Sequence, residues 1–360
     1  MVIDANLYWL PAELFDDQAL AERFLADAEK SVGMSGQLRT DSAGRREIVM
    51  ENPPGFAHLN YRAGDYGLER QLADMDTAGV DHAVLKLPGC QEWMSLDLCR
   101  RFNDGMAEHA RRSGGRLSPL ACVPPSADED CLAELRRCRE ELGTSGVQLS
   151  AHYGADYLDS PRFTAFFEHL GTQPTTVYIH HTPTPVDDAS LLDYTNLRRS
   201  YGRCVDQATA IGREMFSGFF DRHPHLTFVH SMLGGAFFAL LDLLLPPHAP
   251  DVADGRFETA AGGLRRTFAE HVYFELSHAQ PWGAAQLECA VRVLGADHVV
   301  YGSSYPVKRE WMTGGPAFVR ALGLSQADQD LVLGGNAARL YALDGVTGRI
   351  PVDARAAVGS

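Results

Sequence analysis

The sequence predicts an α/β fold, a (β/α)8 TIM barrel with an insertion after the first strand. The chain has 360 residues, which is enough for one large barrel or two average domains. Short β-branched and aromatic runs alternate with helical patterns, as is typical of parallel strands buried on both faces. Polar residues follow these runs, at the edge where barrel enzymes carry their chemistry. We therefore expect one barrel domain, residues 1–348, and a flexible tail, 349–360.

Eight strands are expected in chain order. In the first, Asp4, Asn6 and Tyr8 share one face, which should line the barrel interior because side chains alternate along a strand. The other strands are apolar runs that stop at Gly, Pro or polar residues. The expected strands cover 2–8, 82–87, 117–123, 146–152, 177–179, 226–232, 271–278 and 298–306.

Helical patterns lie between these strands. Leu68, Leu72 and Met75 follow helical spacing, and Gly79 ends the helix. Further helices are expected at 92–112, 128–142, 196–220, 236–245 and 327–343. Residues 32–66 are rich in Gly, Ser, Asn and Pro and are too long for a tight connection. We expect them to form an insertion or lid over the barrel mouth, because they have too few apolar residues for a core of their own.

Composition excludes several classes of protein. The hydrophobic content of 45% and the charged content of 22% are ordinary for a globular chain with a large core. A formal charge of −15 argues against a nucleic-acid surface. No run reaches the ~18 apolar residues of a membrane helix, and the first residues do not resemble a signal peptide. Seven cysteines without a CxxC pair indicate reduced thiols and a cytoplasmic location.

Histidines gather at the ends of strands four to seven, together with one carboxylate. Imidazoles with few carboxylates suit iron, copper, manganese or zinc. Alternation along strands six and seven places His230 and Glu275 on the inward face, and a buried Glu needs a cation as its partner. Each histidine could instead be structural, or could orient a ligand from outside the first coordination sphere. The candidate metal ligands are Asn6, His152, His180, His181, His230, Glu275 and His278.

Four other side chains are weaker candidates. Tyr8 could place a phenol in the site or be a packed aromatic residue. Lys86 could be a base or the partner of a buried acid. Asp4 and His58 could also reach the site.

Several segments, in this order, extend over nearly the whole chain: IDANLYW, ERQLADMDTAGVDHAVL, FNDGMAEHARRSGGRLSPLACVP, DRHPHLTFVHSMLGGAFF, VVYGSSYP and GGNAARLYAL. In this order the chain resembles the amidohydrolase-related family of decarboxylases and hydrolases, which includes aminocarboxymuconate-semialdehyde decarboxylase. The resemblance implies a TIM barrel with a metal site at its mouth.

The chain departs from that family at most of the implied metal ligands. The family carries His-x-His on strand one, where this chain has Asn6 and Tyr8. The family's strand-six histidine corresponds to Met232, and its strand-eight aspartate corresponds to Ser304. His180 on strand five is kept. A zinc-dependent hydrolase cannot work with this set.

A barrel of this type with a relocated, histidine-rich centre resembles the TIM-barrel nonheme diiron monooxygenases, a group represented in platensimycin and platencin biosynthesis. The resemblance implies two iron ions, dioxygen, an external electron donor and hydroxylation of a C–H bond in a CoA-linked substrate of diterpenoid-type antibiotic biosynthesis. In that hypothesis Glu275 and Tyr8 are catalytic. Two alternatives stay open: a metal-dependent decarboxylase or hydrolase with one ion on His180, and a metal-free ligand-binding barrel. Assembly into a homo-oligomer also stays open.

Overall fold

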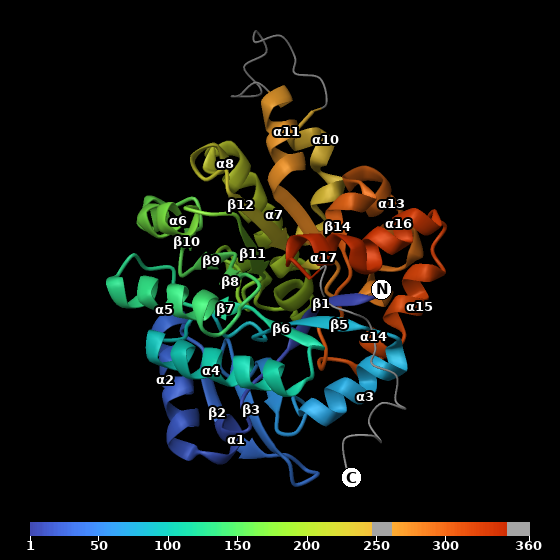
Figure 1. Cartoon of the computed structure of the whole chain (residues 1–360). Helices are drawn as coiled ribbons and strands as arrows, with labels where there is room; N and C mark the ends of the chain where they lie inside the picture. Colours follow the sequence, from blue (N-terminus) through green and yellow to red (C-terminus); the bar gives the residue numbers. More distant parts are fainter. Residues whose placement is uncertain (247–260, 344–360) are drawn as a thin grey trace.

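Parallel strands form a barrel at the centre of the molecule, and helices surround it (Figure 1). The computed structural model of the chain describes residues 1–246 and 261–343. The expected tail, 349–360, lies outside the described residues. The barrel strands are β1 (Ile3–Tyr8), β5 (His82–Lys86), β6 (Leu117–Pro119), β7 (Ala121–Cys122), β8 (Val147–Ser150), β11 (Thr175–His180), β12 (Leu226–His230), β13 (Val272–Glu275) and β14 (Val299–Val300).

Two runs of neighbouring strands complete the barrel. One has the order β1-β5-β6, and the other has the order β14-β13-β12-β11-β8-β7. β6 and β7 follow each other directly in one strand position, interrupted at Leu120. At the other seam the N–H of Ala5 donates to the carbonyl of Tyr301 at 3.0 Å, and the N–H of Tyr8 donates to that of Tyr305 at 2.8 Å. The predicted α/β barrel is confirmed.

Alternation along the strands separates the barrel interior from the layer beneath the helices. Val84, Tyr178 and Val229 belong to a small interior cluster, which α17 (Asn336–Leu340) closes at one end. Their strand neighbours belong to the larger cluster between strands and helices. The β1–β5 register shifts between Asp4 and Leu7. This irregularity turns Asp4 toward Ser303 and leaves the side chains of Asn6 and Tyr8 inside the barrel.

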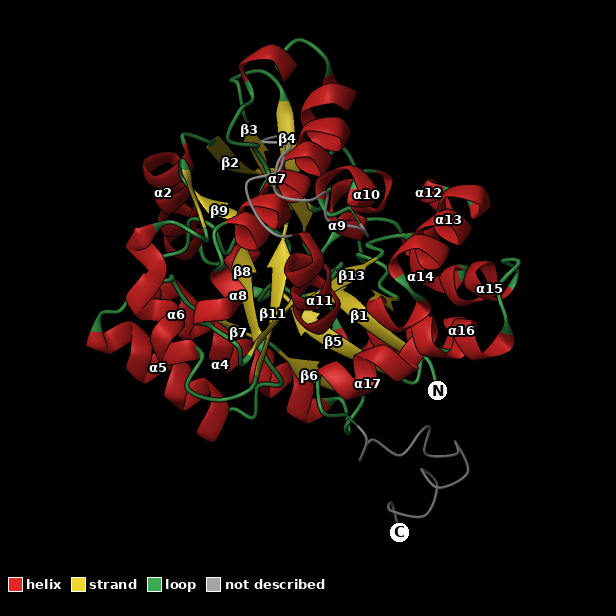
Figure 2. Cartoon of the chain, turned by 90° about the horizontal axis from the view of Figure 1, so that it is seen from above, coloured by secondary structure: helices red, strands yellow, loops and turns green. Residues whose placement is uncertain are grey.

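Helices cover the barrel on its outside, as the view from above shows (Figure 2). The helices of this layer are α3 (Leu68–Ala78), α4 (Leu96–Arg112), α5 (Glu129–Glu140), α6 (Thr164–Leu170), η3 (Leu197–Tyr201), α7 (Gly202–Phe216), α8 (Phe219–Arg222), α11 (Ala261–His271), α12 (Ala279–Trp282), α13 (Ala284–Leu294), η6 (Ala296–His298), α14 (Arg309–Thr313), α15 (Gly315–Arg320), α16 (Gln326–Asp330) and η7 (Leu331–Gly335). Those predicted are α3, α4 and α5, the segment η3–α8 (expected as one helix, 196–220) and the segment α16–α17 (expected as one helix, 327–343). The others were not predicted from the sequence.

The helix expected at 236–245 is broken into short pieces. They are α9 (Met232–Ala236), η4 (Phe237–Ala239) and α10 (Leu241–Leu244). Positive φ angles at Leu233, Gly234, Gly235 and Ala236 interrupt the helix. Gly235 is required by packing as well, because a Cβ there would lie 1.7 Å from the carbonyl oxygen of Cys204 on α7.

The insertion after the first strand folds as two helices and an antiparallel sheet, made of α1 (Glu13–Asp16), α2 (Gln18–Val32), β2 (Ser35–Thr40), β3 (Arg46–Glu51) and β4 (Ala57–Arg62). The sheet is bonded to loops that follow the barrel strands. Tyr61 donates to the carbonyl of Pro88 at 2.9 Å, and His58 Nε2 lies 2.5 Å from the carbonyl of Pro183. A lid function for 32–66 stays a prediction.

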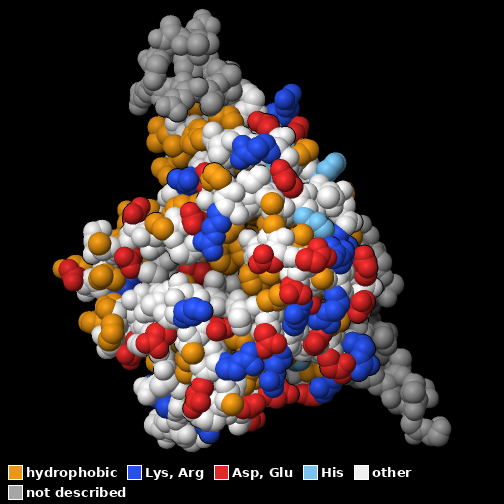
Figure 3. All heavy atoms as spheres, turned by 90° about the vertical axis from the view of Figure 1, so that its left-hand side faces the viewer, with side chains coloured by type: hydrophobic (Ala, Val, Ile, Leu, Met, Phe, Trp, Pro, Cys, Tyr) orange, Lys and Arg blue, Asp and Glu red, His pale blue; other side chains and the backbone are white. Residues whose placement is uncertain are grey.

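Exposed apolar side chains gather on part of the surface. Figure 3 shows hydrophobic side chains together toward the top of one face. The exposed large hydrophobic residues of α7 and of the α9–α10 region include Val205, Phe216, Leu240 and Leu243. Contact with a second copy of the chain stays a prediction. In the part of the chain that the structure describes, no helix is long and apolar enough to cross a bilayer.

Candidate active site

A pocket of about 270 Å³ opens at the carboxyl ends of the barrel strands, beneath β4. The mouth of a parallel barrel is the usual place of catalysis, because the loops after the strands converge there. Side chains from β1, β4, β11 and α7 surround the pocket. It is lined by Tyr8, Leu59, Asn60, Tyr61, Arg62, Asp65, Tyr66, Pro88, Gly89, His180, His181, Pro183, Arg199, Arg203, Pro306 and Val307.

Tyr8 and His180 form a hydrogen-bonded pair in this pocket. The Tyr8 hydroxyl lies 2.9 Å from His180 Nε2, and His180 Nδ1 lies 2.6 Å from the carbonyl oxygen of His181. Because a carbonyl only accepts, Nδ1 carries the hydrogen and Nε2 accepts from Tyr8. Burial lowers the pKa of His180 to about 3, and the nearby charges of Lys86 and Arg203 also lower it. Burial raises the pKa of Tyr8. Both side chains are therefore neutral at pH 7.

Asn6 lies at the centre of a polar layer below this pair. Its Nδ2 lies 3.0 Å from Glu275 Oε2 and 3.1 Å from the hydroxyls of Tyr178 and Ser304. Tyr178 also donates to Glu275 Oε2 at 2.6 Å. Gly302 makes room for the carboxylate, since a Cβ there would lie 1.9 Å from Glu275 Oε1. The layer closes the bottom of the site with hydrogen bonds between residues far apart in the chain.

Ionisable groups without solvent contact accompany this layer. Burial raises the pKa of Glu275 and of Asp4, and it lowers the pKa of Lys86 well below its usual range. The positive charge of Lys86 opposes the shift of both carboxyl groups. Lys86 Nζ donates to the carbonyl of Ala5 at 2.8 Å and lies 3.0 Å from the centre of the Tyr178 ring. The Lys86 side chain therefore occupies the centre of the barrel, beside Tyr178 of the polar layer.

His230 does not face the barrel interior, contrary to the expectation. Its Nε2 lies 2.9 Å from Glu214 Oε2, and its Nδ1 lies 3.2 Å from Gln207 Oε1, both on α7. The expected orientation assumed that alternation continues from His230 to Met232. β12 ends at His230, and Met232 has φ of 54°. The interior position in β12 belongs to Val229.

The remaining candidate histidines have separate partners. His152 lies 2.6 Å from Thr182 Oγ1 and 3.3 Å from Asp206 Oδ2, toward α7. His181 Nδ1 lies 3.2 Å from Ser231 Oγ, and its ring stacks on His180 with centroids 4.2 Å apart. The His278 ring stacks on Trp311 at 4.4 Å. These side chains therefore do not converge on one point.

The residues at the mouth do not fit a divalent metal ion. Within residues 1–246 and 261–343, no three His, Cys, Asp or Glu side chains lie close enough to hold one ion. Besides His180, the inherited positions offer the amide of Asn6, the phenol of Tyr8, the thioether of Met232 and the hydroxyl of Ser304. Asn6 bonds to Glu275 and Ser304, and Tyr8 bonds to His180. Such neutral donors are poor ligands for iron or zinc. The expected pair of iron ions therefore has no ligand set in the described part of the chain.

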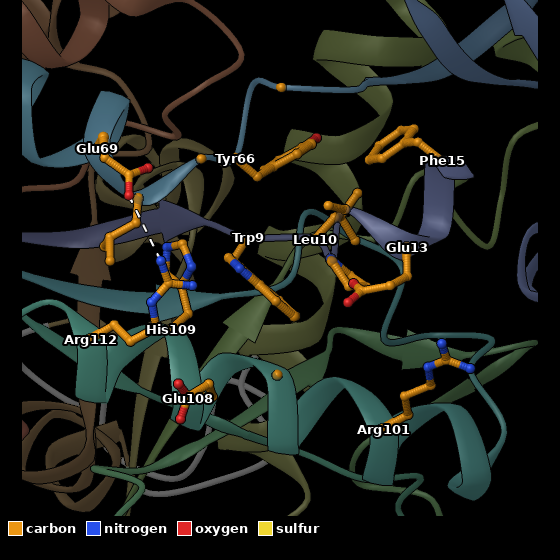
Figure 4. A pocket seen from close by; sticks show the side chains of 16 residues that line it. Trp9, Leu10, Glu13, Phe15, Tyr66, Glu69, Arg101, Glu108, His109 and Arg112 are labelled. Carbon is orange, nitrogen blue, oxygen red and sulfur yellow. Dashed lines mark ion pairs between the residues drawn. The ribbon is translucent and has the colours of Figure 1, made fainter. Parts of the chain in front are cut away.

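A larger cavity of about 420 Å³ lies outside the barrel, between α3 and α4 (Figure 4). Two of its polar side chains already have partners: Glu69 lies 3.8 Å from Arg112 (dashed line in Figure 4), and His109 Nε2 lies 2.8 Å from Gln71 Oε1. The cavity is not at the strand ends. We therefore place the candidate active site in the mouth pocket.

Residues 3–343 match the family described as amidohydrolase. The chain belongs to the amidohydrolase family. A gamma-resorcylate decarboxylase from Rhizobium radiobacter is 24% identical over 347 residues, which cover 87% of this chain and 100% of that protein.

Solved structures of two decarboxylases share the fold. 5-Carboxyvanillate decarboxylase from Sphingomonas paucimobilis has a TM-score of 0.72 at 22% identity and covers 95% of this chain and 98% of its own. Dihydroxybenzoic acid decarboxylase from Polaromonas sp. JS666, with bound manganese and the inhibitor 2-nitroresorcinol, has a TM-score of 0.69 at 19% identity. It covers 95% of this chain and 97% of its own.

These relatives overturn the monooxygenase hypothesis. They are decarboxylases, which are lyases and not oxidoreductases, and their names refer to small aromatic carboxylates. The expected CoA-linked substrate, dioxygen, electron donor and role in diterpenoid-type antibiotic biosynthesis are therefore wrong. The hypothesis depended on a relocated metal centre. His152, His230 and His278 do not form one, because each of them contacts a different partner.

Arg199 and Arg203 were not predicted from the sequence, although both line the pocket. They lie in the helical segment after strand five, one helical turn apart. Helical spacing alone would pair Arg203 with Asp206, three residues later. In the structure the Asp206 carboxylate instead accepts hydrogen bonds from the hydroxyl of Tyr157 at 2.7 Å and from that of Thr182 at 3.0 Å. Only the tertiary contacts of Asp206 reveal that, within the described residues, Arg203 has no carboxylate partner.

Proposed function

We propose that this protein is a decarboxylase, a lyase that removes the carboxylate of a small aromatic acid at the barrel mouth. The decarboxylases among its relatives support this reaction class. The observation that carries the proposal is the Tyr8–His180 pair, which faces a pocket that is also lined by Arg203, an arginine without a carboxylate partner among the described residues.

The size and lining of the pocket favour a single-ring substrate. A volume of about 270 Å³ lies just below the usual range for ligand pockets, which begins at about 300 Å³. Tyr8, Tyr61 and Tyr66 offer aromatic faces or edges on which a flat ring can stack. The carboxylate of the substrate carries the charge opposite to that of Arg199 and Arg203, which line the same pocket.

Loss of carboxylate from a hydroxylated aromatic acid requires a proton on the ring carbon that bears the carboxylate. In the proposed sequence Tyr8 accepts the proton of the substrate hydroxyl while it donates its own to His180 Nε2. The electron pair of the broken O–H bond moves into the ring. The proton then returns from His180 through Tyr8 to the ring carbon. The C–C bond breaks, carbon dioxide leaves, and the bonding pair forms a phenolate that takes a proton from solvent.

The low pKa of His180 suits the second half of this sequence. With a pKa of about 3, the imidazolium that forms transiently is a strong acid and readily returns its proton to a weakly basic carbon. The hydrogen bond from Nδ1 to the His181 carbonyl fixes the tautomer and the ring orientation. The layer of Asn6, Glu275 and Tyr178 positions Tyr8 and His180 from below.

The test is turnover of hydroxylated benzoates such as 2,6-dihydroxybenzoate, followed by release of carbon dioxide and by chromatography of the phenol. Replacement His180→Ala should lower kcat about 10²–10⁴-fold, the usual contribution of a positioned acid–base group. His169→Ala, on α6 and away from the pocket, is the matched control. Full turnover by the His180 variant would refute the assigned relay. Binding of these acids without any carbon dioxide release would favour the ligand-binding barrel instead.

A further inference from the structure

Arg203 has an unusual environment in the wall of the mouth pocket. Its Nε donates to the carbonyl of Pro183 at 3.2 Å, whereas its Nη2 is buried and has no hydrogen-bond partner. A buried guanidinium N–H without an acceptor is costly, and native structures rarely leave one so. Among the described residues, Nη2 therefore lacks an acceptor, and the Arg203 side chain lines the same pocket as Tyr8 and His180.

The charge of Arg203 is not neutralised by the protein. In the part of the chain that the structure describes, no carboxylate oxygen lies within ion-pair distance of Arg198, Arg199 or Arg203. Arg199 also lines the pocket, so a second positive charge lies in the same helical part of its wall. Burial, together with the neighbouring Arg199, lowers the pKa of Arg203 to about 10, which leaves the group protonated at neutral pH.

The positive charge of Arg203 reaches the reacting side chains. Arg203 lines the same pocket as Tyr8 and His180. Its charge opposes the upward shift that burial gives the pKa of Tyr8, and it adds to the downward shift of the pKa of His180. An anion bound at Nη2 would therefore lie beside the proton relay. A guanidinium group binds a carboxylate with two parallel hydrogen bonds. This geometry neutralises the charge of the carboxylate and also orients the aromatic ring that carries it.

The same region lacks the donors that a divalent ion requires. The inherited ligand positions hold Asn6, Tyr8 and Ser304, which are neutral, and the nearby carboxylate of Glu275 already accepts from Asn6, Tyr178 and Ser277. A site without metal ligands needs another positive charge to bind an acid.

We infer that Arg203 binds the substrate carboxylate and that it, instead of a divalent metal ion, supplies the positive charge of this site. The inference rests on the proposed decarboxylase function for the identity of the substrate. The binding step itself can be measured separately from turnover, with acids that do not react.

The experiment compares benzoate with its neutral analogue benzamide by calorimetric titration. The protein is used as purified, with its metal content measured, and again after treatment with a chelator. We expect benzoate to bind at least about tenfold more tightly than benzamide, since hydrogen bonds to a charged partner are the stronger ones. The preference should persist after chelation and disappear in Arg203→Gln. Arg213→Gln is the matched control, because Arg213 lies on the same helix and pairs with Asp159 at the surface.

A second variant keeps the test decisive if Arg203→Gln folds poorly. Arg203→Lys retains the charge without the paired hydrogen bonds, and it should keep part of the preference for benzoate. Benzoate binding that requires added manganese, or that is equal in wild type and Arg203→Gln, would overturn the inference. Tight, metal-independent benzoate binding without turnover of any hydroxybenzoate would refute the decarboxylase function but leave the anion site standing.

Discussion

Replacement Tyr178→Phe tests the polar layer that supports the candidate active site. The hydroxyl of Tyr178 donates to Glu275 Oε2 at 2.6 Å, and Asn6 donates to the same hydroxyl at 3.1 Å. Both residues are fully buried. The substitution removes one donor from a carboxyl group that water cannot reach, and it leaves the shape of the side chain almost unchanged.

The expected cost follows from these contacts. A hydrogen bond to a charged group contributes about 1.5–3 kcal/mol, and a buried group left without its partner loses that amount. The Asn6 and Ser277 donors remain on Glu275, so the loss should stay within this range. For a chain of this length it corresponds to a fall of about 2–4 °C in Tm.

Tyr341→Phe is a matched control, because Tyr341 lies in the same interior cluster and its buried hydroxyl has no hydrogen-bond partner. This second substitution should be neutral or stabilising. Urea and thermal unfolding, followed by circular dichroism, measure both variants against wild type. Equal effects of the two substitutions would show that the Tyr178–Glu275 bond does not stabilise the barrel, and the reasoning about the polar layer would fail.

Two further predictions concern pH and packing. Burial lowers the pKa of His82 to about 4, whereas an unfolded histidine has a pKa near 6.5. Between these two pH values the unfolded state therefore binds more protons than the folded state. The free energy of unfolding should fall by up to ~1.4 kcal/mol per pH unit as the pH drops through that window. His82→Gln should reduce this pH dependence in urea unfolding between pH 7 and pH 5, and an unchanged slope would contradict the assignment. Gly302→Ala should destabilise the fold or displace Glu275, because the new Cβ would lie 1.9 Å from Oε1. Gly263→Ala, in α11 with nothing within 4 Å, should instead stabilise by about 0.5–1 kcal/mol; equal effects of the two glycine substitutions would refute the packing argument.

The sequence alone determined the barrel and much of what faces its mouth. Alternating apolar runs and helical spacing are local patterns, and they placed the eight strands within a few residues of their positions. The same alternation predicted that Asn6, Tyr8 and Glu275 point inward, and these side chains lie inside the barrel. Order along the chain was enough for Glu275, because side-chain direction in a regular strand depends only on position. In β1 the inward direction of Asn6 and Tyr8 also depends on the irregularity between Asp4 and Leu7.

Only the tertiary structure decided which side chains contact one another at the candidate site, and therefore which chemistry the site can carry out. Alternation failed for His230, because β12 ends there and the backbone turns at Met232. Arg203 became a candidate only when Asp206 was found bonded to other side chains. Asn6 meets Glu275 across 269 residues. No local pattern encodes such contacts, since they depend on how distant strands and helices pack, and a metal centre cannot be inferred from residue types before those distances are known.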